Sequence, residues 1–300
     1  MPSQGPHLST SELHAFLLVA EQGAISRAAP ILGVSQPALS WTIRQLEERF
    51  ETALFVRGAR GVSLTRSGQI LSKRARGLLR EIEVLETELR DERETVRGLY
   101  SIGVHPTLAT HTLPRFLPQL FEAWPELQIN IEHSSSQAIT QGVVDLQYDL
   151  GIVVNPQRHP DLTIVHLYDD LVRLWASPKL SWSFEQPRLP LLINPEMPQA
   201  AQILAQLQKK NWFPEWRAVH TTDLHVISEL TAAQCGIGVL PEGVARRMPH
   251  RSLLAIQHSP TVKDEIALIW RQDAQQSKAS GLIREAIKTR LKEKQGRRKK

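Results

Sequence analysis

Residues 26–47, SRAAPILGVSQPALSWTIRQLE, constrain the fold of this chain more than any other segment. They predict two short helices joined by a tight turn at Gly33 and Val34. Ser35 is placed to cap the second helix, and Pro37 falls in its first turn, where a missing N–H costs little. This is the helix-turn-helix pattern, in which the second helix enters the major groove of DNA. The segment therefore predicts double-stranded DNA as a partner.

The second helix of this motif divides into two faces at about 100° per residue. Leu39, Ile43 and Leu46 share one face and are expected in a small core. A guanidinium on the opposite face bonds guanine or a phosphate, and a hydroxyl does so more weakly. That face also admits a simpler interpretation as a solvated surface, but the preceding helix and turn favour DNA contact. The outward-facing residues are Pro37, Ser40, Trp41 and Arg44.

The elements on either side complete a winged domain. Residues 9–12, STSE, form a capping-box sequence, and the apolar residues that follow have helical spacing. Residues 54–56 and 62–65 read as two short strands around a tip rich in glycine and arginine. Arginines at such a tip suit the phosphate backbone or the minor groove, although solvated tips are also common. The predicted DNA contacts are Arg27, Ser35, Gln36, Pro37, Ser40, Trp41, Arg44, Arg57 and Arg60.

The run VSQPALSWTIRQLEERFETALFVRGARGVSLTRSG, residues 34–68, resembles the N-terminal signature of LysR-type transcriptional regulators nearly residue for residue. Two positions depart from that family pattern. Trp41 stands where the family commonly carries arginine or another polar residue, and Pro30 lies inside the first helix of the motif. Trp41 has two interpretations, contact with a thymine methyl or sugar and packing against the domain's own surface. Pro30 is expected to kink or shorten its helix.

A long helix is expected after the wing, with Thr65 as its cap. Its apolar residues alternate at spacings of four and three, and Val96 resumes the pattern after an interruption. Such a narrow seam favours pairing with a second copy of the chain. The seam consists of Leu71, Ala75, Leu78, Ile82, Leu85 and Leu89.

The family resemblance implies the same dimer through this linker helix, and assembly as a homotetramer. Two wings and two recognition helices read two half-sites, so the operator is expected to be an interrupted, roughly palindromic sequence. RNA polymerase is a further partner if the protein activates transcription.

From residue 98 onward, strands and helices alternate, which implies a mostly parallel sheet with helices on both faces. Strands are expected at 99–104, 127–132, 149–154 and 266–270, with helices at 113–124, after 134–136, and from about 277. This region resembles the effector-binding domain of LysR-type regulators. That domain has the fold of periplasmic binding proteins, with two α/β lobes and a cleft between them.

The predicted fold is therefore an α+β multidomain chain with three parts. A winged helix-turn-helix domain is expected over residues 1–66 and a dimerising linker helix over 67–97. The α/β two-lobed effector-binding domain is expected over 98–300. Its lobe I is expected at about 98–169 and 258–295, and its lobe II at about 170–257.

An effector site is predicted where strands end and helices begin. Open α/β sheets bind ligands beyond the carboxyl ends of their strands, where helix N-termini point N–H groups into the crevice. The ligand expected there is a small molecule, anionic molecules included, held mainly by hydroxyls and backbone amides. Serine and threonine at helix starts are also ordinary caps, so both interpretations stay open. The selected residues are Pro106, Thr107, Ser134, Ser135, Ser136, Met197, Gln199, His220, Thr221 and Thr222.

Enzymatic activity is not expected. The sequence has no GxSxG, HExxH or Walker motif, and its eleven histidines show no metal-ligand spacing. Neither a metal nor a cofactor is therefore predicted. The recognition helix offers few base-reading side chains, which leaves open a second function, that of a sequence-indifferent or architectural DNA-binding protein.

The composition fits a protein that works beside DNA. The net charge is +5, which gives mild support for a nucleic-acid partner. No apolar run reaches about eighteen residues, and the first residues lack the pattern of a signal peptide, so we expect a cytoplasmic protein without a membrane partner. The single cysteine, Cys235, excludes an internal disulfide and is expected to pack as a small apolar residue.

Overall fold

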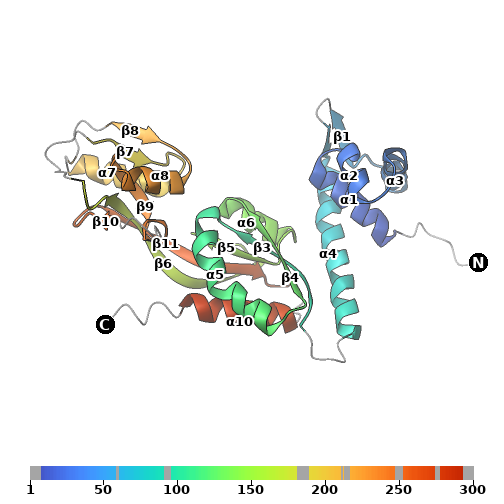
Figure 1. Ribbon diagram of the computed structural model, residues 1–300. Coiled ribbons are helices and arrows are strands. Elements are labelled where there is room, and N and C mark those ends of the chain that lie inside the picture. Colours follow the sequence, from blue (N-terminus) through green and yellow to red (C-terminus); the bar gives the residue numbers. More distant parts are fainter. Residues whose placement is uncertain are drawn as a thin grey trace, which may run out of the picture. The chain divides into compact units, whose positions relative to one another are not determined.

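The computed structural model describes residues 8–58, 61–90, 96–180, 189–210, 212, 217–246, 253–273 and 278–292 (Figure 1). The chain divides into two compact units. The first comprises Met1–Thr95 and Asp145–Gln147, and the second Val96–Val144 and Tyr148–Lys300. The division lies close to residue 98, where the sequence predicts the start of the effector-binding domain.

The first unit contains the predicted winged helix-turn-helix. The turn after α2 uses Gly33 at φ 66°, and the Oγ of Ser35 accepts a hydrogen bond of 3.3 Å from the backbone N–H of Ala38 in α3. Helix α2, which contains Pro30, is only seven residues long, as expected. The elements are α1 (Thr10–Gln22), α2 (Ile25–Ile31), α3 (Gln36–Arg49), β1 (Phe55–Gly58), β2 (Gly61–Leu64) and α4 (Arg66–Arg90).

The predicted inner face of α3 is confirmed. Leu39, Ile43 and Leu46 are all buried in the core of the first unit. Phe16 of α1 and Phe55 of β1 join them, with ring centroids 5.2 Å apart. The core thus fixes α3 from one side and leaves its opposite face to solvent.

A half-buried ion pair connects the start of α1 to the end of α3. Glu12 completes the predicted capping box, because its carboxylate accepts from the backbone N–H of Ser9 and its own N–H donates to the Ser9 hydroxyl. The same carboxylate accepts two hydrogen bonds of 2.9 Å from the guanidinium of Arg49. The Arg49 hydrogen bonds are the main reason that the pKa of Glu12 falls from 4.5 to about 2.

Replacing Glu12 with glutamine is expected to destabilise the first unit in a pH-dependent way. The pKa of Glu12 is lower when folded, so its charge stabilises the fold above about pH 5, and this contribution is lost as the pH falls towards 2. We expect Glu12→Gln to lower the free energy of unfolding at pH 7 by about 1–3 kcal/mol. Thermal unfolding followed by circular dichroism across this pH range measures the difference. The exposed Glu48→Gln serves as control, and a difference that does not narrow with acid contradicts the assignment.

The predicted seam of α4 separates into two parts. Thr65 caps the helix as expected, since its Oγ1 accepts from the N–H of Gly68 at 3.0 Å. Ala75 is fully buried against α1, together with Leu13 and Leu79, and Leu71 packs on the same cluster. Ala75 therefore belongs to the chain's own core, which corrects the prediction for this residue, while Leu71 is half-buried beside it. This happens because α1 covers the first turns of α4.

Farther along α4 the seam is open to solvent. Leu78, Ile82 and Leu85 are 48%, 37% and 53% exposed. The side chain of Leu89 lies outside the described residues. Val96, expected to resume the seam, is instead buried in the core of the second unit.

The second unit is built on one nine-stranded sheet of order β4-β3-β5-β11-β6-β9-β7-β8, with β10 paired to β6. Its strands are β3 (Gly98–Val104), β4 (Leu127–His133), β5 (Leu150–Val154), β6 (Leu162–Ala176), β7 (Leu191–Ile193), β8 (Ala218–His220), β9 (Ile237–Pro241), β10 (Leu254–Ala255) and β11 (Thr261–Arg271). Its helices are α5 (Pro106–Ala123), α6 (Ser136–Val144), α7 (Pro198–Lys209), α8 (Leu224–Ala232), α9 (Glu242–Ala245) and α10 (Lys278–Lys292).

Two lobes share this sheet, as expected, but the sheet is mixed rather than mostly parallel. The outer strands of each lobe pair in parallel, β3 with β4 and β5, and β7 with β8 and β9. Between them, the long strands β6 and β11 pair antiparallel to each other and to their neighbours. Figure 1 shows these two strands running from the group around α5, α6 and α10 to the group around α7 and α8. They cross between the lobes in opposite directions, and this explains the antiparallel pairing.

Two local expectations also change. Helix α5 begins at Pro106, well before the predicted residue 113, because proline at the first helical position starts a helix rather than only ending a strand. Cys235 is exposed after the end of α8 and does not pack as a small apolar residue. Among the helices of the described part of the chain, none has the length and apolar character needed to cross a bilayer.

Candidate DNA-binding face and effector cleft

The outer face of α3 presents the side chains that the sequence predicts for DNA. Trp41 is 64% exposed, so most of this residue faces solvent. Gln36 and Pro37 are exposed at the start of the helix, Arg44 is exposed farther along, and Ser40 is half-buried. These residues form one face, opposite the core residues of the same helix.

The remaining predicted DNA contacts lie around this face. Ser35 caps α3 and is exposed. The guanidinium of Arg27 donates to the backbone carbonyl of Gln22, which holds the side chain at the end of α1. Arg57 is exposed on β1, and Arg60 lies outside the described residues.

The wing is fixed to α1 by backbone contacts. The N–H of Val62 donates to the carbonyl oxygen of Gly23 at 2.8 Å. Gly61 has φ 127°, and a Cβ there would lie 2.2 Å from the same oxygen. Only glycine permits this approach. The position of the wing beside the helix-turn-helix is therefore set by the backbone itself.

A cavity of about 720 Å³ lies in the second unit, with walls from both lobes. This volume is in the range of small-molecule sites. Of the predicted effector residues, Ser134, His220 and Thr221 do not line it, and His220 is exposed on the short strand β8. The predicted residues that do line it are Pro106, Thr107, Ser135, Ser136, Met197, Gln199 and Thr222.

The serine hydroxyls of the cavity wall already have partners within the chain. The Oγ of Ser135 accepts from the N–H of Ala138 in the first turn of α6, so the capping interpretation holds for this residue. The Oγ of Ser136 accepts from the N–H of Val154 at 2.9 Å. A hydroxyl that accepts one hydrogen bond keeps its own hydrogen for a ligand. These contacts orient the two hydroxyls at the cavity wall.

Two carboxylates of the cavity were not predicted from the sequence. Asp170 of β6 and Asp264 of β11 line the cavity and stand directly opposite each other in the antiparallel ladder. Asp170 accepts from the backbone N–H groups of Leu171 and Gly243. Asp264 accepts from the side-chain amides of Asn155 at 2.7 Å and Gln199 at 2.5 Å.

Both carboxylates have raised pKa values. Burial is the largest cause for Asp170, whose pKa rises from 3.8 to about 6. The backbone hydrogen bonds oppose this rise, and the charges of Glu242 and Asp264 add to it. Burial also raises the pKa of Asp264, against the hydrogen bonds from Gln199 and Asn155. Keeping these two carboxylates ionised therefore costs free energy, and a positively charged partner would reduce that cost.

Other cavity residues also escaped the sequence analysis, among them His105. Its Nδ1 lies 2.8 Å from the Oγ1 of Thr107, and burial lowers its pKa, which favours the neutral ring. It directly follows a predicted strand, so the strand-end rule that selected Pro106 would have found it. Most of the other missed residues lie on the long strands or in loops. They do not follow a predicted strand at the start of a helix, so the pattern that selected Pro106 does not select them. The missed lining residues include His105, His111, Asn155, Arg158, His159, Asp170, Asn194 and Asp264.

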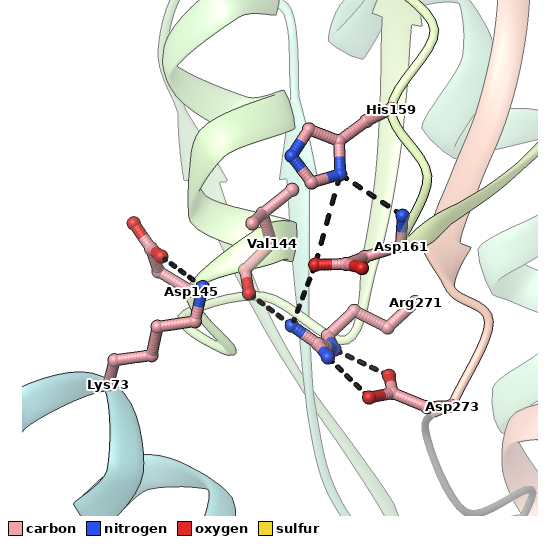
Figure 2. Close-up of polar contacts among 7 residues, drawn as sticks. All are labelled: Lys73, Val144, Asp145, His159, Asp161, Arg271 and Asp273. Atoms are coloured by element: carbon pink, nitrogen blue, oxygen red, sulfur yellow. Dashed lines mark hydrogen bonds and ion pairs between the residues drawn. The ribbon is translucent and has the colours of Figure 1, made fainter.

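A polar cluster at the end of β11 supports one wall of the cavity (Figure 2). Arg271 donates to the backbone carbonyl of Val144 at 2.7 Å, at the C-terminal end of α6, where a cation is favourable. It also lies 3.9 Å from a carboxylate oxygen of Asp161 and bonds to Asp273. Asp161 in turn donates from its N–H to His159, a cavity residue. Arg271 thus holds the end of the loop that lines the cavity.

The two parts of the chain match two family models. The model described as "LysR substrate binding domain" matches residues 93–292. The model described as "Bacterial regulatory helix-turn-helix protein, lysR family" matches residues 10–69. The matches cover the strands and helices around the cavity and the winged helix-turn-helix.

Individual relatives agree with these matches. The HTH-type transcriptional regulator BbuR of Bordetella bronchiseptica is 31% identical over 214 residues, which are 69% of this chain and 65% of that protein. The DNA-binding transcriptional dual regulator OxyR of Escherichia coli is 25% identical over an alignment of 301 positions, covering 95% of this chain and 96% of OxyR.

Solved structures share the fold. A full-length OxyR variant from Pseudomonas aeruginosa superposes with a TM-score of 0.69 at 20% identity, covering 95% of each chain. CbnR, a LysR family transcriptional regulator, gives a TM-score of 0.65 at 22% identity, covering 95% of this chain and 99% of CbnR. Since the substrate-binding model alone spans well over half of the chain, the chain belongs to the LysR family of transcriptional regulators.

Proposed function

We propose that this regulator binds an interrupted inverted repeat in DNA as a dimer and responds to a small molecule held in the cavity of its second unit. The observation that carries the DNA part is the outward face of α3, where Trp41 and Arg44 are exposed opposite a packed core. A helix so placed, beside a wing fixed to α1, has the geometry that enters a major groove.

We assign a physical role to each predicted DNA contact in the described part of the chain. Arg44 reaches a guanine edge or a phosphate, and Gln36 and Ser40 supply further hydrogen-bonding groups at the groove. Trp41 offers an apolar surface to a thymine methyl or a sugar. Arg57 on the wing suits the phosphate backbone, where contacts set position rather than sequence. Ser35, Pro37 and Arg27 shape the approach of α3 to the groove.

The dimer is proposed to form through the open part of the α4 seam. Leu78, Ile82 and Leu85 share one face of the helix and are left exposed by the chain itself. Covering them with the same face of a second copy buries apolar surface and gives a symmetric pair. We extend this to a homotetramer from the family resemblance alone.

We propose that binding of a small molecule in the cavity regulates the protein. A ligand that binds one arrangement of the two lobes better than another shifts the population of the protein's states, and only by that difference in affinity. The single cysteine cannot form a disulfide within the chain, so we infer a reversibly bound effector. The relatives are named regulators, and we infer that this protein acts on DNA in the cytoplasm without catalysing a reaction.

Selection from a randomised DNA pool tests this function. Purified full-length protein is mixed with random duplexes at near-physiological salt, and the retained sequences are read. We expect an interrupted inverted repeat to be enriched. Retention without any enriched sequence contradicts the proposal and favours the sequence-indifferent alternative.

A further inference from the structure

The two strands that run between the lobes carry facing carboxylates. Asp170 and Asp264 are register partners in β6 and β11, the strands that run between the lobes, and both are buried in the cavity wall. Directly opposed like charges weaken a strand pair. Burial adds to this cost, because a carboxylate loses its hydration when it leaves water. The chain therefore keeps an unfavourable pair of carboxylates in the cavity wall.

A third acceptor lies beside this pair. Gln199, at the start of α7, is 8% exposed and lines the same cavity. Its Nε2 donates to Asp264 at 2.5 Å, and Oε1 is the other polar atom of the amide. This Oε1 is buried, and no residue in the described part of the chain donates to it. An unpaired buried acceptor is costly, and a ligand donor is one way to satisfy it.

Positive charge around the cavity is scarce. The charged residues of its described lining are Asp170, Glu196, Asp264 and the exposed Arg158. Three histidines, His105, His111 and His159, also line it, and burial favours the neutral form of His105. Glu242 adds another carboxylate near Asp170, and it is paired with Arg246 at 2.6 Å and with Arg173 at 3.8 Å. The cavity thus offers acceptors and negative charge where a ligand would lie.

We propose that the effector carries an ammonium or guanidinium group, which binds between Asp170 and Asp264 and donates to Oε1 of Gln199. This inference rests on the proposed role of the cavity as the effector site. A cation there neutralises the facing carboxylates and replaces the hydration that they lost. The hydroxyls and helix N-termini taken alone would accommodate an anionic effector. The facing carboxylates favour a cationic one instead.

The position of the pair gives the cation a regulatory effect. Asp264 lies on a strand that runs between the lobes, and Gln199 lies on α7, so a cation that binds both has an affinity that depends on how α7 sits on that strand. Asp264 also receives hydrogen bonds from Asn155 on the loop after β5 and from Gln199 on α7, so it connects elements of both lobes. Binding of the cation therefore affects contacts made by both lobes.

Calorimetric titration of the full-length protein with small cations tests the inference. The probes are putrescine and agmatine, compared with 1,4-butanediol and succinate, which have the same four-carbon spacing with neutral or anionic ends. We expect at least one cation to bind at millimolar concentration or below, one per chain, and the diol and succinate to fail as competitors. Asp170→Asn and Asp264→Asn keep an acceptor oxygen but lose the charge, and each should weaken binding by at least about tenfold.

Matched variants separate a ligand site from a structural one. Glu265→Gln removes an exposed carboxylate next to Asp264 and should leave cation binding unchanged. If the pair served the fold alone, the asparagine variants would melt at a lower temperature without ligand and would bind the cations like the natural protein. That result, the absence of binding by both cations, or preferential binding of succinate overturns the inference.

Operator binding is measured on the same samples, so that the proposed regulator function and the proposed cation site are tested separately. Specific DNA binding without cation binding removes only the cation inference. Cation binding that leaves operator affinity unchanged removes the regulatory role of the cavity and leaves the cation site standing. Failure to enrich any DNA sequence counts against the proposed function, whatever the cations do.

Discussion

Replacing Arg44 with alanine is expected to abolish selective operator binding while the protein stays folded. The side chain is exposed on the outer face of α3, away from the core formed by Leu39, Ile43 and Leu46. A bidentate arginine contact with a base contributes about 1–3 kcal/mol of discrimination. A dimer uses two copies, so the expected loss is about 2–6 kcal/mol, or roughly 30-fold to more than 10⁴-fold in affinity.

Electrophoretic mobility shift titrations with the enriched operator measure this loss. Arg44→Lys keeps the charge but not the planar fork, and should retain binding to random DNA while losing selectivity. Glu48→Ala, another exposed substitution on α3, is the matched control and should have little effect. An Arg44→Ala protein that prefers its operator as strongly as the natural protein would exclude α3 as the reading element.

Replacing Leu85 with glutamate is expected to dissociate the dimer and weaken operator binding with it. Leu85 is 53% exposed on α4, so the change disturbs few contacts within the chain. In a symmetric interface the substitution places two like charges in a desolvated apolar contact, at a cost of several kcal/mol. Loss of the second half-site then reduces affinity for the full operator by about 10²–10⁴-fold.

Sedimentation velocity and operator titration of the same variant measure both effects. Gln69→Glu introduces the same charge on the opposite side of α4, and the variant should remain a dimer. A Leu85→Glu protein that sediments like the natural protein and binds its operator normally would show that the seam does not join two copies.

Local chemistry explains what the sequence could predict. The cap at Ser35, the turn at Gly33 and the apolar spacing of Leu39, Ile43 and Leu46 act within a few residues, and each is present in the structure. Thr65 caps α4 for the same reason. The helix starts that line the cavity were found because a strand followed by a capping residue is also a local pattern.

Contacts between distant residues explain what the sequence could not predict. Glu12 reads as a capping residue, but its bond to Arg49 spans 37 positions. The pairing of Asp170 with Asp264 depends on the register of β6 and β11, which no local signal encodes. Ala75 fits a heptad seam in sequence, and only the packing of α1 on α4 assigns it to the chain's own core.

Competition between the enriched operator and random DNA tests the central claim most directly. The dissociation constants of full-length protein for both duplexes are measured over a range of salt concentrations. We expect the operator to bind at least about 10³-fold more tightly at near-physiological salt, because base contacts survive where phosphate contacts weaken. A ratio near one, with both affinities falling equally with salt, would contradict a sequence-specific regulator and favour an architectural DNA-binding protein.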